Sequence, residues 1–432
     1  VREEILDNVK RLRHHACLGL ICGNSEVEQS FVDNPEFKGG SEGLKVDSQK
    51  LFDQMIRQIC LECAPQTFYW NSSPSSGGNF DNPNDETRGD SHYWDVWREG
   101  VYFSDYRNHL MRFCSEFGFQ SFPSLKTVKT FTKEEDRNIF SEVMESHQKN
   151  HDANSKLITY IAKYFLFPKD MESLMYLTQI LQALSVKYGV EHFRRNRGVC
   201  MGALYWQLND CWPGASFSSI DYFGRWKALQ YMSKNFFAPI AGSILLDGNV
   251  ATIYVQNETR DIEPRRVKIS LQTFDFRLLH EAEVSVEIMP GGVELVYSID
   301  YTEYIKGIEN RVFMEATFYD EEDNVVSNEI EVFVPYKRLA LENSSISYSV
   351  IELPDEYVIR MMSGGFAAFV ELDLRQADAV FSENYFHLTS KREKAVRLKK
   401  SDIRYLNVGT PEIQNGYELE QQLVIRTLRD TY

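Results

Sequence analysis

The chain has 432 residues, and 63 acidic against 47 basic residues give it a formal net charge of −16. A surface with this excess of negative charge repels phosphate backbones and anionic lipid, which argues against a nucleic-acid or membrane-surface partner. Charged residues at 25% and apolar residues at 43% are typical of a folded globular protein, and the length predicts about three domains.

The first half of the chain alternates predicted helices with short apolar strands. The predicted strands, which all end in polar or aromatic residues, are 18–22, 67–70, 92–97, 112–116 and 201–206. We expect the first of them to be buried, and the spacing of apolar residues predicts mainly helix between 130 and 197. Strands that alternate with helices predict a parallel sheet or a β/α barrel, in which the active site lies at the carboxyl ends of the strands.

The second half of the chain changes to short strands of period two. All six Trp and all seven Cys occur before residue 227. Apolar and polar residues then alternate, for example over Val267–Leu271 and Val284–Ile288. Alternation with turn clusters at this spacing predicts two antiparallel β-sandwiches. We therefore expect three domains, at 1–238, 239–337 and 338–432.

Two glutamates stand at the ends of predicted strands, Glu26 and Glu116. A pair of carboxyl groups that face each other across a barrel mouth is the minimal equipment for glycoside hydrolysis, because one can donate a proton while the other attacks the sugar. With 63 acidic residues in the chain, the alternative is that either glutamate is a solvated surface residue. A set of tryptophans at or just beyond strand ends favours a carbohydrate cleft over core packing. These are Trp70, Trp94, Trp97, Trp206 and Trp212.

Other potential binding motifs are weak. The single Cys60-Leu-Glu-Cys63 has no second cysteine pair at zinc spacing, so we expect reduced thiols on or near a helix and no metal. The histidines show no ligand spacing, and His92 is the only one that we place near a site. The basic stretch 391–400 alternates with apolar residues, which favours a strand with one solvated face over a polyanion site.

Four segments, in chain order, carry longer motifs. They are Arg11 to Glu26, Tyr69 to Ser76, Phe113 to Pro123 and Gly202 to Pro213, and they include Gly23-Asn-Ser-Glu26 and Trp206-Gln-Leu-Asn-Asp-Cys-Trp-Pro213. With these segments the chain resembles glycoside hydrolase family 2, and within it the β-mannosidases. The resemblance covers the first half well, and the second half suits the same family with weaker motifs. It implies a multidomain chain in which a partial (β/α)8 TIM barrel precedes two immunoglobulin-like β-sandwiches.

The resemblance also implies roles for individual residues. Glu26 is similar to the general acid/base of the family, and Glu116 to the nucleophile that forms a covalent mannosyl-enzyme. Trp206 looks like the aromatic platform beneath the terminal mannose, and Trp94 with Tyr93 lines the same subsite. The resemblance implies no metal and no organic cofactor.

The chain departs from the family pattern in two ways. Where the family has Gly-Asn-Asn-Glu, this chain has Gly23-Asn-Ser-Glu26, so Asn24 and Ser25 are the candidate substrate-binding residues of this loop. Ser25 is shorter than the family's Asn, which bonds the 2-hydroxyl of the sugar, so we expect reduced activity or a water in that contact. Family members also carry a jelly-roll domain, a sandwich and three barrel strands ahead of the point that matches Val1. We therefore expect residues 1–238 to supply at most five of the eight barrel strands.

The sequence therefore predicts a retaining, exo-acting glycoside hydrolase that releases terminal β-D-mannose from β-mannosides and manno-oligosaccharides. Two alternatives stay open: a truncated, non-catalytic carbohydrate-binding remnant, and a sister activity on β-galactosides, β-glucuronides or β-glucosaminides. We expect no nucleic-acid or membrane partner. A bacterial cytoplasm is the expected location, with a lysosomal or secreted form left open, and the oligomeric state is not predicted.

Overall fold

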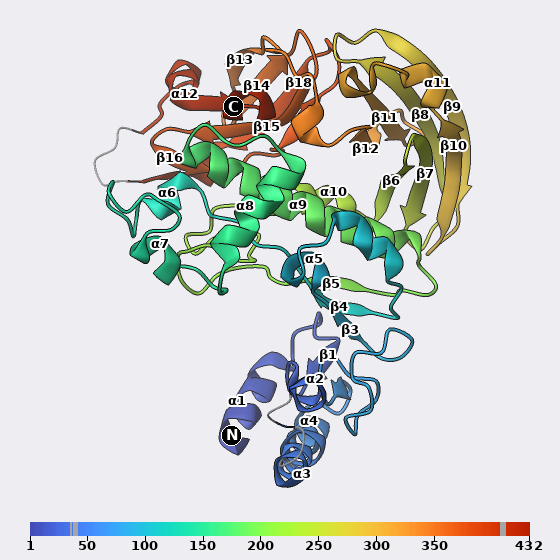
Figure 1. The fold of residues 1–432 in the computed structure, drawn as a ribbon, viewed down its shortest axis with the longest axis vertical. Helices are drawn as coiled ribbons and strands as arrows, with labels where there is room; N and C mark the ends of the chain where they lie inside the picture. The colour runs from blue at the N-terminus through green and yellow to red at the C-terminus, as the bar shows by residue number, and fades with distance from the viewer. Residues whose placement is uncertain (35–36, 38–41, 407–411) are drawn as a thin grey trace. The chain divides into compact units, whose positions relative to one another are not determined.

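The computed structural model describes residues 1–34, 37, 42–406 and 412–432 (Figure 1). The chain divides into two compact units. Unit 1 comprises Val1–Val96, Ser104–Phe117 and His192–Tyr205, and unit 2 comprises Trp97–Phe103, Gly118–Glu191 and Trp206–Tyr432. Among the helices of the described residues, none combines the length and apolar character that a bilayer crossing requires.

Unit 1 contains five short parallel strands. They are β1 (Leu20–Cys22), β2 (Phe68–Trp70), β3 (Ser91–Tyr93), β4 (Cys114–Phe117) and β5 (Ala203–Tyr205). Strand β1 pairs with β2, and the other three form a sheet in the order β3-β4-β5, with parallel pairing throughout. Each predicted strand of the first half thus overlaps a strand of three or four residues, but the prediction for 92–97 is wrong beyond Tyr93, because Asp95–Arg98 form a helix.

Several helices of unit 1 precede β2 in the chain. They are α1 (Arg2–Leu12), α2 (Val27–Asp33), α3 (Glu42–Ser48), the π-helix η1 (Gln49–Ile56) and α4 (Arg57–Cys63). Val9 of α1, Ile56 of η1 and Cys60 of α4 form a core cluster with Tyr69 of β2, against which Ile21 packs. The seven cysteines are free, and Cys60 and Cys63 lie on α4, as the sequence predicts.

The expectation that strand 18–22 is buried is wrong. Leu20 is 47% exposed, and Phe68, its register partner in β2, is 59% exposed. Successive side chains of a strand point to opposite faces, so Ile21 and Tyr69 face the helices while Leu20 and Phe68 share the other face. The apolar run therefore belongs to a strand with one covered face, not to a strand covered on both.

Unit 2 contains the long helical stretch that the sequence predicts between 130 and 197. Its helices are α6 (Leu125–Val128), α7 (Glu142–Ser146), α8 (Ala153–Tyr164) and α10 (Ala228–Phe236). Three further elements, α5 (Asp95–Arg98), the 3-10 helix η2 (Phe103–Asn108) and α9 (Met171–Arg195), have residues in both units. Helix α9 is the longest, and its residues Leu177, Leu181 and Val186 are fully buried.

The first β-sandwich of unit 2 consists of two antiparallel sheets. One has the order β10-β7-β6 and the other β12-β11-β8-β9. The strands are β6 (Ile240–Asp247), β7 (Val250–Asn257), β8 (Glu263–Thr273), β9 (Leu278–Ile288), β10 (Val293–Asp300), β11 (Val312–Tyr319) and β12 (Val325–Val332). Alternate residues such as Val267, Ile269 and Leu271 fill its core, as their period of two predicts. Helix α11 (Thr302–Ile305) contributes Ile305 to the same core.

The second sandwich follows, with short antiparallel sheets in the orders β13-β14-β18, β17-β15-β20 and β16-β19. Its elements are β13 (Ser347–Glu352), β14 (Glu356–Met362), β15 (Ala367–Leu374), β16 (Ala377–Ala379), β17 (Phe386–Leu388), β18 (Lys394–Lys399), β19 (Ile403–Tyr405), α12 (Gly416–Gln422) and β20 (Leu423–Arg426). In β18, Val396 and Leu398 are buried while their neighbours are exposed, which confirms the strand predicted for the basic stretch.

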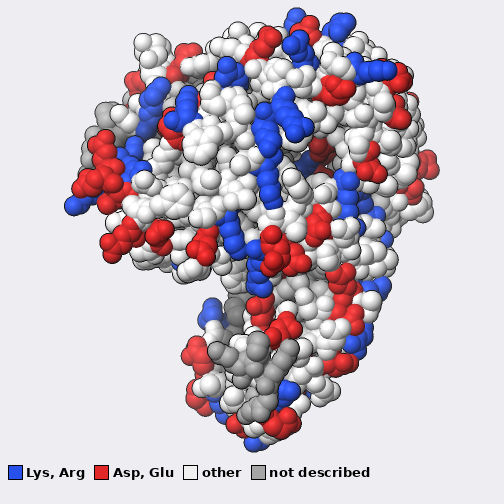
Figure 2. Space-filling model, viewed as in Figure 1, with Lys and Arg blue, Asp and Glu red and all other residues white. Residues whose placement is uncertain are grey.

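Helix α9 forms ion pairs with strands of both sandwiches within unit 2. The Nζ atom of Lys187 lies 3.0 Å from Oε2 of Glu329 in β12, and Glu172 lies 2.7 Å from Arg426 in β20. Elsewhere acidic and basic side chains are interspersed over the surface, as Figure 2 shows for one face. The negative net charge is thus spread out on that face.

Candidate active site

Two adjacent strands place a histidine and a glutamate side by side. His92 in β3 and Glu116 in β4 are register partners in the parallel sheet. Partners on neighbouring strands project from the same face, so the two side chains meet. Strand β4 is held in place by Phe117, which is fully buried and packs edge-to-face against Tyr106 and Phe193.

Glu26 comes from the loop that follows β1. Its φ angle is 61°, in the left-handed region that few non-glycine residues adopt, and its backbone N–H donates to the carbonyl of Ser73 at 2.6 Å. The loop can approach β2 this closely because position 23 is glycine. A Cβ atom on Gly23 would lie 2.4 Å from both the carbonyl oxygen of Asn71 and the hydroxyl of Tyr69. The conformation of Glu26 is therefore set by the end of β2.

Asn24 is the side chain that shapes this loop. Its Nδ2 donates to the carbonyl of Asn71 at 3.0 Å, and its Oδ1 accepts from the backbone N–H of Val27 at 3.2 Å and from the hydroxyl of Ser72 at 2.7 Å. Ser25 continues the parallel pairing through an isolated bridge to Ser73. Both candidate loop residues thus contact the segment after β2, which is one of the four segments singled out in the sequence.

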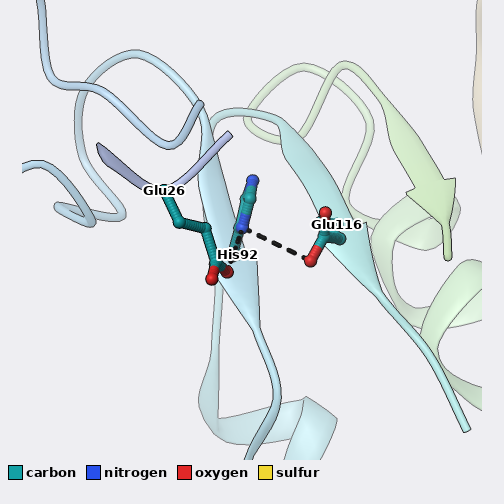
Figure 3. A group of neighbouring side chains, drawn as sticks. All are labelled: Glu26, His92 and Glu116. Carbon is teal, nitrogen blue, oxygen red and sulfur yellow. Dashed lines mark hydrogen bonds and ion pairs between the residues drawn. The ribbon is translucent and has the colours of Figure 1, made fainter. Parts of the chain in front are cut away.

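These elements bring Glu26 and Glu116 to the same imidazole (Figure 3). Nδ1 of His92 lies 2.9 Å from Oε1 of Glu26 and 3.6 Å from Oε1 of Glu116. One oxygen of each carboxylate and one nitrogen of His92 all lie within 4.8 Å of one another. The His92 side chain is only 3% exposed, that of Glu116 is 16% exposed, and that of Glu26 is 34% exposed. Glu26 is therefore the member of the pair that is open to solvent.

The second nitrogen of His92 joins a hydrogen-bond chain. Nε2 lies 2.9 Å from the hydroxyl of Ser73, and this hydroxyl donates to Oδ2 of Asp90 at 2.6 Å. Ser115 also donates to Oδ2 at 2.6 Å, while Oδ1 of Asp90 accepts from Nε1 of Trp70 at 2.7 Å. Asp90 thus accepts from several donors at once, which is the environment of an ionised carboxylate.

This hydrogen-bond network bears on which nitrogen of the His92 imidazole carries a proton. The Ser73 hydroxyl donates to Asp90, so its oxygen can accept a hydrogen bond from Nε2 of His92 in the tautomer that carries the ring proton there. In the neutral ring Nδ1 then carries a lone pair, and this lone pair faces the oxygens of Glu26 and Glu116. A carboxyl group at this position can donate a hydrogen bond to Nδ1 only when it is protonated.

The two aromatic residues after His92 lie in different surroundings. Trp94 is buried and its Nε1 donates to Oε1 of Glu116 at 3.0 Å. Tyr93 is buried on the opposite face of β3, where its hydroxyl donates to Asp105 and its ring lies against His109. Burial and the Asp105 carboxylate raise the pKa of Tyr93 well above its usual value. The structure thus places Trp94 at the carboxylates and Tyr93 at η2.

Trp206 follows β5 directly and is 46% exposed, but it belongs to unit 2. The structure therefore brings Glu26, Glu116 and Trp94 together within unit 1. Sequence reasoning missed Ser73, Asp90 and Ser115. A signal for two of them was present, because Ser73 and Ser115 lie within the motif-bearing segments at strand ends.

Comparisons with known proteins concern both halves of the chain. Residues 249–338 match a family model described as a mannosidase Ig/CBM-like domain, and residues 341–431 match one described as an Ig-fold domain of mannosidases. The two matched regions contain the strands of the first and second sandwich.

Curated relatives align with the whole chain or most of it. A β-mannosidase from Capra hircus is 30% identical over 100% of this chain and 51% of the relative, and one from Bos taurus is 29% identical with the same coverage. A β-mannosidase B from Aspergillus niger is 28% identical over 84% of this chain and 46% of the relative. The chain thus spans about half the length of the curated relatives it matches.

Solved structures share the fold. A β-D-mannosidase from Dictyoglomus thermophilum matches with a TM-score of 0.84 and 28% identity, over 99% of this chain and 50% of that chain. The exo-chitosanase CsxA of Amycolatopsis orientalis matches with a TM-score of 0.68 over 99% of this chain and 52% of that chain, and its 12% identity shows a common fold alone.

Proposed function

Because the chain belongs to the β-mannosidase branch of glycoside hydrolase family 2, we propose that it carries the catalytic pair of a retaining exo-β-mannosidase. The substrates are β-mannosides and manno-oligosaccharides, from which terminal β-D-mannose is released. One observation supports the proposal most strongly. Glu26 and Glu116, which the motifs single out 90 residues apart, face the same nitrogen of His92.

The separation of the two carboxylates favours a retaining mechanism. Retaining glycosidases hold their carboxyl groups roughly 5–5.5 Å apart, whereas inverting enzymes leave about 6.5–9.5 Å for a water molecule. In this chain an oxygen of Glu26 and an oxygen of Glu116 lie within 4.8 Å of each other. That distance supports attack on the sugar by a carboxylate in preference to attack by an intervening water.

The surroundings of the two glutamates support different roles for them. Glu116 accepts a hydrogen bond from Trp94 and is the less exposed of the pair, so it acts as the ionised nucleophile. Its carboxylate attacks the anomeric carbon as the bond to the leaving oxygen breaks. Glu26, open to solvent and bonded to Nδ1 of His92, gives its proton to that oxygen. Glu26 then takes a proton from the water that releases mannose from Glu116.

The remaining proposals concern the fold and the sugar pocket. Strands β1 to β5 with their helices form part of a (β/α)8 barrel within residues 1–238, followed by the sandwiches at 239–337 and 338–432. Trp94 lines the mannose subsite next to Glu116 within unit 1, and Trp206 is the aromatic residue that the motifs assign to stacking on the sugar. Asn24 and Ser25 line the pocket from the Glu26 loop, and Tyr93 supports it from behind β3 through its bond to Asp105.

The test is hydrolysis of an aryl β-D-mannoside. Glu116→Gln should lower kcat by about a thousandfold or more, since it removes the nucleophile. Glu26→Ala should lower hydrolysis as well, and azide should restore turnover by releasing β-mannosyl azide, in which the configuration is retained. Glu62→Gln, an identical change at an exposed position of α4, is the matched control. Undiminished activity of Glu116→Gln would exclude the assignment.

A substrate panel separates the proposal from the alternatives. We expect the highest kcat/KM on the β-mannoside among aryl β-mannoside, β-galactoside, β-glucuronide and β-glucosaminide. A preference for one of the other three would identify a sister activity. Calorimetric binding of mannobiose without turnover of any glycoside would instead favour a carbohydrate-binding protein.

A further inference from the structure

The three side chains at the centre of the site also have the composition of a metal site. One imidazole nitrogen and two carboxylate oxygens lie within 4.8 Å of one another, from His92, Glu26 and Glu116. Imidazole and carboxylate ligands together suit Zn²⁺, whereas Mg²⁺ and Ca²⁺ prefer oxygen ligands alone. Three protein ligands with one open position are also typical of zinc sites that bind a water molecule or a small ligand.

The distances fit zinc coordination after small side-chain movements. At bond lengths of roughly 2.0–2.2 Å, tetrahedral geometry places ligand atoms about 3.3 Å apart. The two distances from Nδ1 of His92, 2.9 Å to Glu26 and 3.6 Å to Glu116, lie on either side of that value. The 34% exposure of the Glu26 side chain leaves the fourth position accessible to water.

The hydrogen-bond chain behind His92 prepares the ring as a ligand. When Nε2 carries the ring proton it can donate to the Ser73 hydroxyl, which donates to Asp90, and the lone pair on Nδ1 then faces the carboxylates. Histidine ligands of metals in proteins commonly donate their other N–H to an acceptor that fixes the tautomer and the ring orientation. In this site the Ser73 hydroxyl is the acceptor, and Asp90 holds that hydroxyl in place.

We propose that Glu26, His92 and Glu116 bind one Zn²⁺ ion, and that the ion competes with the glycoside. The two carboxylates balance its charge. Inhibition follows because both reacting carboxylates become ligands. Binding of the ion is independent of the proposed hydrolysis, whereas inhibition rests on the proposed function.

Calorimetric titration of the chelator-treated protein with zinc chloride tests the binding. We expect one site that His92→Gln weakens by about 100-fold or more, since loss of a supporting residue alone commonly costs about 10–100-fold. Ser73→Ala, which keeps all three ligands, should weaken binding by about 10–100-fold. His151→Gln is the matched control, because the side chain of His151 is 93% exposed and pairs with its neighbour Asp152. Equal zinc affinity in His92→Gln and the unchanged protein would overturn the proposal.

Free cysteines require a second readout, since Cys17, Cys22 and Cys211 are exposed thiols that can bind zinc. Cobalt(II) in place of zinc should give the absorption of a nitrogen- and oxygen-ligated ion, without the thiolate charge-transfer band. A thiolate band that persists in His92→Gln would place the ion at cysteine and contradict the proposal. Thermal unfolding of each variant verifies that it is folded.

Kinetics distinguish failure of the metal site from failure of the proposed function. Competitive inhibition of aryl β-mannoside hydrolysis by zinc, reversed by a chelator, is the expected result. Hydrolysis that zinc does not slow would overturn the inhibitory role alone. Zinc binding that depends on His92, in a protein that hydrolyses no β-mannoside, would support the metal site and exclude the proposed function.

Discussion

Gly23 determines how closely the Glu26 loop approaches the end of β2. A Cβ atom there would lie 2.4 Å from a backbone oxygen and from the hydroxyl of Tyr69, and backbone atoms cannot yield as a flexible side chain does. Gly23→Ala should therefore displace Glu26 from His92. Because misplacement by about 1 Å can cost about 100-fold, we expect kcat/KM for an aryl β-mannoside to fall by about that factor.

Gly19→Ala provides the control for that prediction, because a Cβ atom on Gly19 would meet nothing within 4 Å. Rates and thermal unfolding of the two variants should be measured together. If both alanine variants keep the same rate, the close approach at Gly23 has no part in positioning Glu26.

At this scale the sequence placed Glu26, Glu116, His92 and Trp94 at strand ends, but not the hydrogen-bond chain behind His92. Glu26 and Glu116 could be found because polar residues that follow parallel strands meet at one edge of a sheet. The link from His92 through Ser73 to Asp90 could not, since it joins residues 19 and 17 positions apart through the path of a loop. Local periodicity contains no information about that path. Tyr93 illustrates the same limit, because its hydroxyl bonds to Asp105 of a different element.

Strand β17 contributes a half-buried histidine to the second sandwich. His387 lies between the rings of Phe366 and Phe369, and its Nδ1 has no hydrogen-bond partner. Burial, with a smaller effect of the Lys187 charge, lowers the pKa of His387 from 6.5 to about 3. Between these two values the unfolded chain binds a proton that the folded chain does not. The free energy of unfolding therefore falls as the pH falls from 6.5 towards 3.

The substitution His387→Phe should remove this fall of the unfolding free energy at low pH. Urea unfolding at pH 7 and pH 5 gives the drop in unfolding free energy for each protein, and we expect the drop to be about 2 kcal/mol smaller in the variant. Any packing cost of the larger ring is present at both pH values and cancels in the comparison. His151→Gln at the surface is the control. An equal drop in His387→Phe and the unchanged protein would contradict this account.

The elements themselves were predictable to different degrees. The sandwich strands are long and alternate strictly, so their period of two identifies the buried face, as in β8 and β18. The strands of unit 1 have only three or four residues, too few for a period to show which side is covered. An apolar run such as 18–22 therefore looks buried, although helices pack on only one side of β1 and β2.

At the scale of the whole molecule, buried charges on α9 help to hold unit 2 together. Lys187 lies 3.2 Å from Glu191, 3.0 Å from Glu329 and 3.8 Å from Glu331. Burial alone would lower the pKa of Lys187, but the three carboxylates raise it well above its usual value. The lysine therefore stays charged and compensates carboxylates that are themselves out of water.

Lys187→Met should destabilise the protein by about 3–5 kcal/mol, because it leaves buried carboxylates without their cation. Urea unfolding measures the loss, and the double change Lys187→Met with Glu329→Gln should recover part of it. Lys268→Met is the control, since Lys268 and its partner Glu281 are 39% and 45% exposed and such a pair contributes less than about 1 kcal/mol. If Lys187→Met lowers the free energy of unfolding no more than Lys268→Met does, the ion pairs of Lys187 contribute little to stability.

The exposed pair Leu20 and Phe68 affects the balance of attraction and repulsion between molecules of this protein in solution. Their apolar face attracts a second copy, while the net charge of −16 repels it. Salt screens the repulsion over about 10 Å at 0.1 M and leaves the apolar attraction in place. Static light scattering should therefore give a second virial coefficient that falls from positive towards negative as salt is added. In Leu20→Ser with Phe68→Ser the coefficient should fall less for the same addition of salt, because one exposed apolar face has been removed.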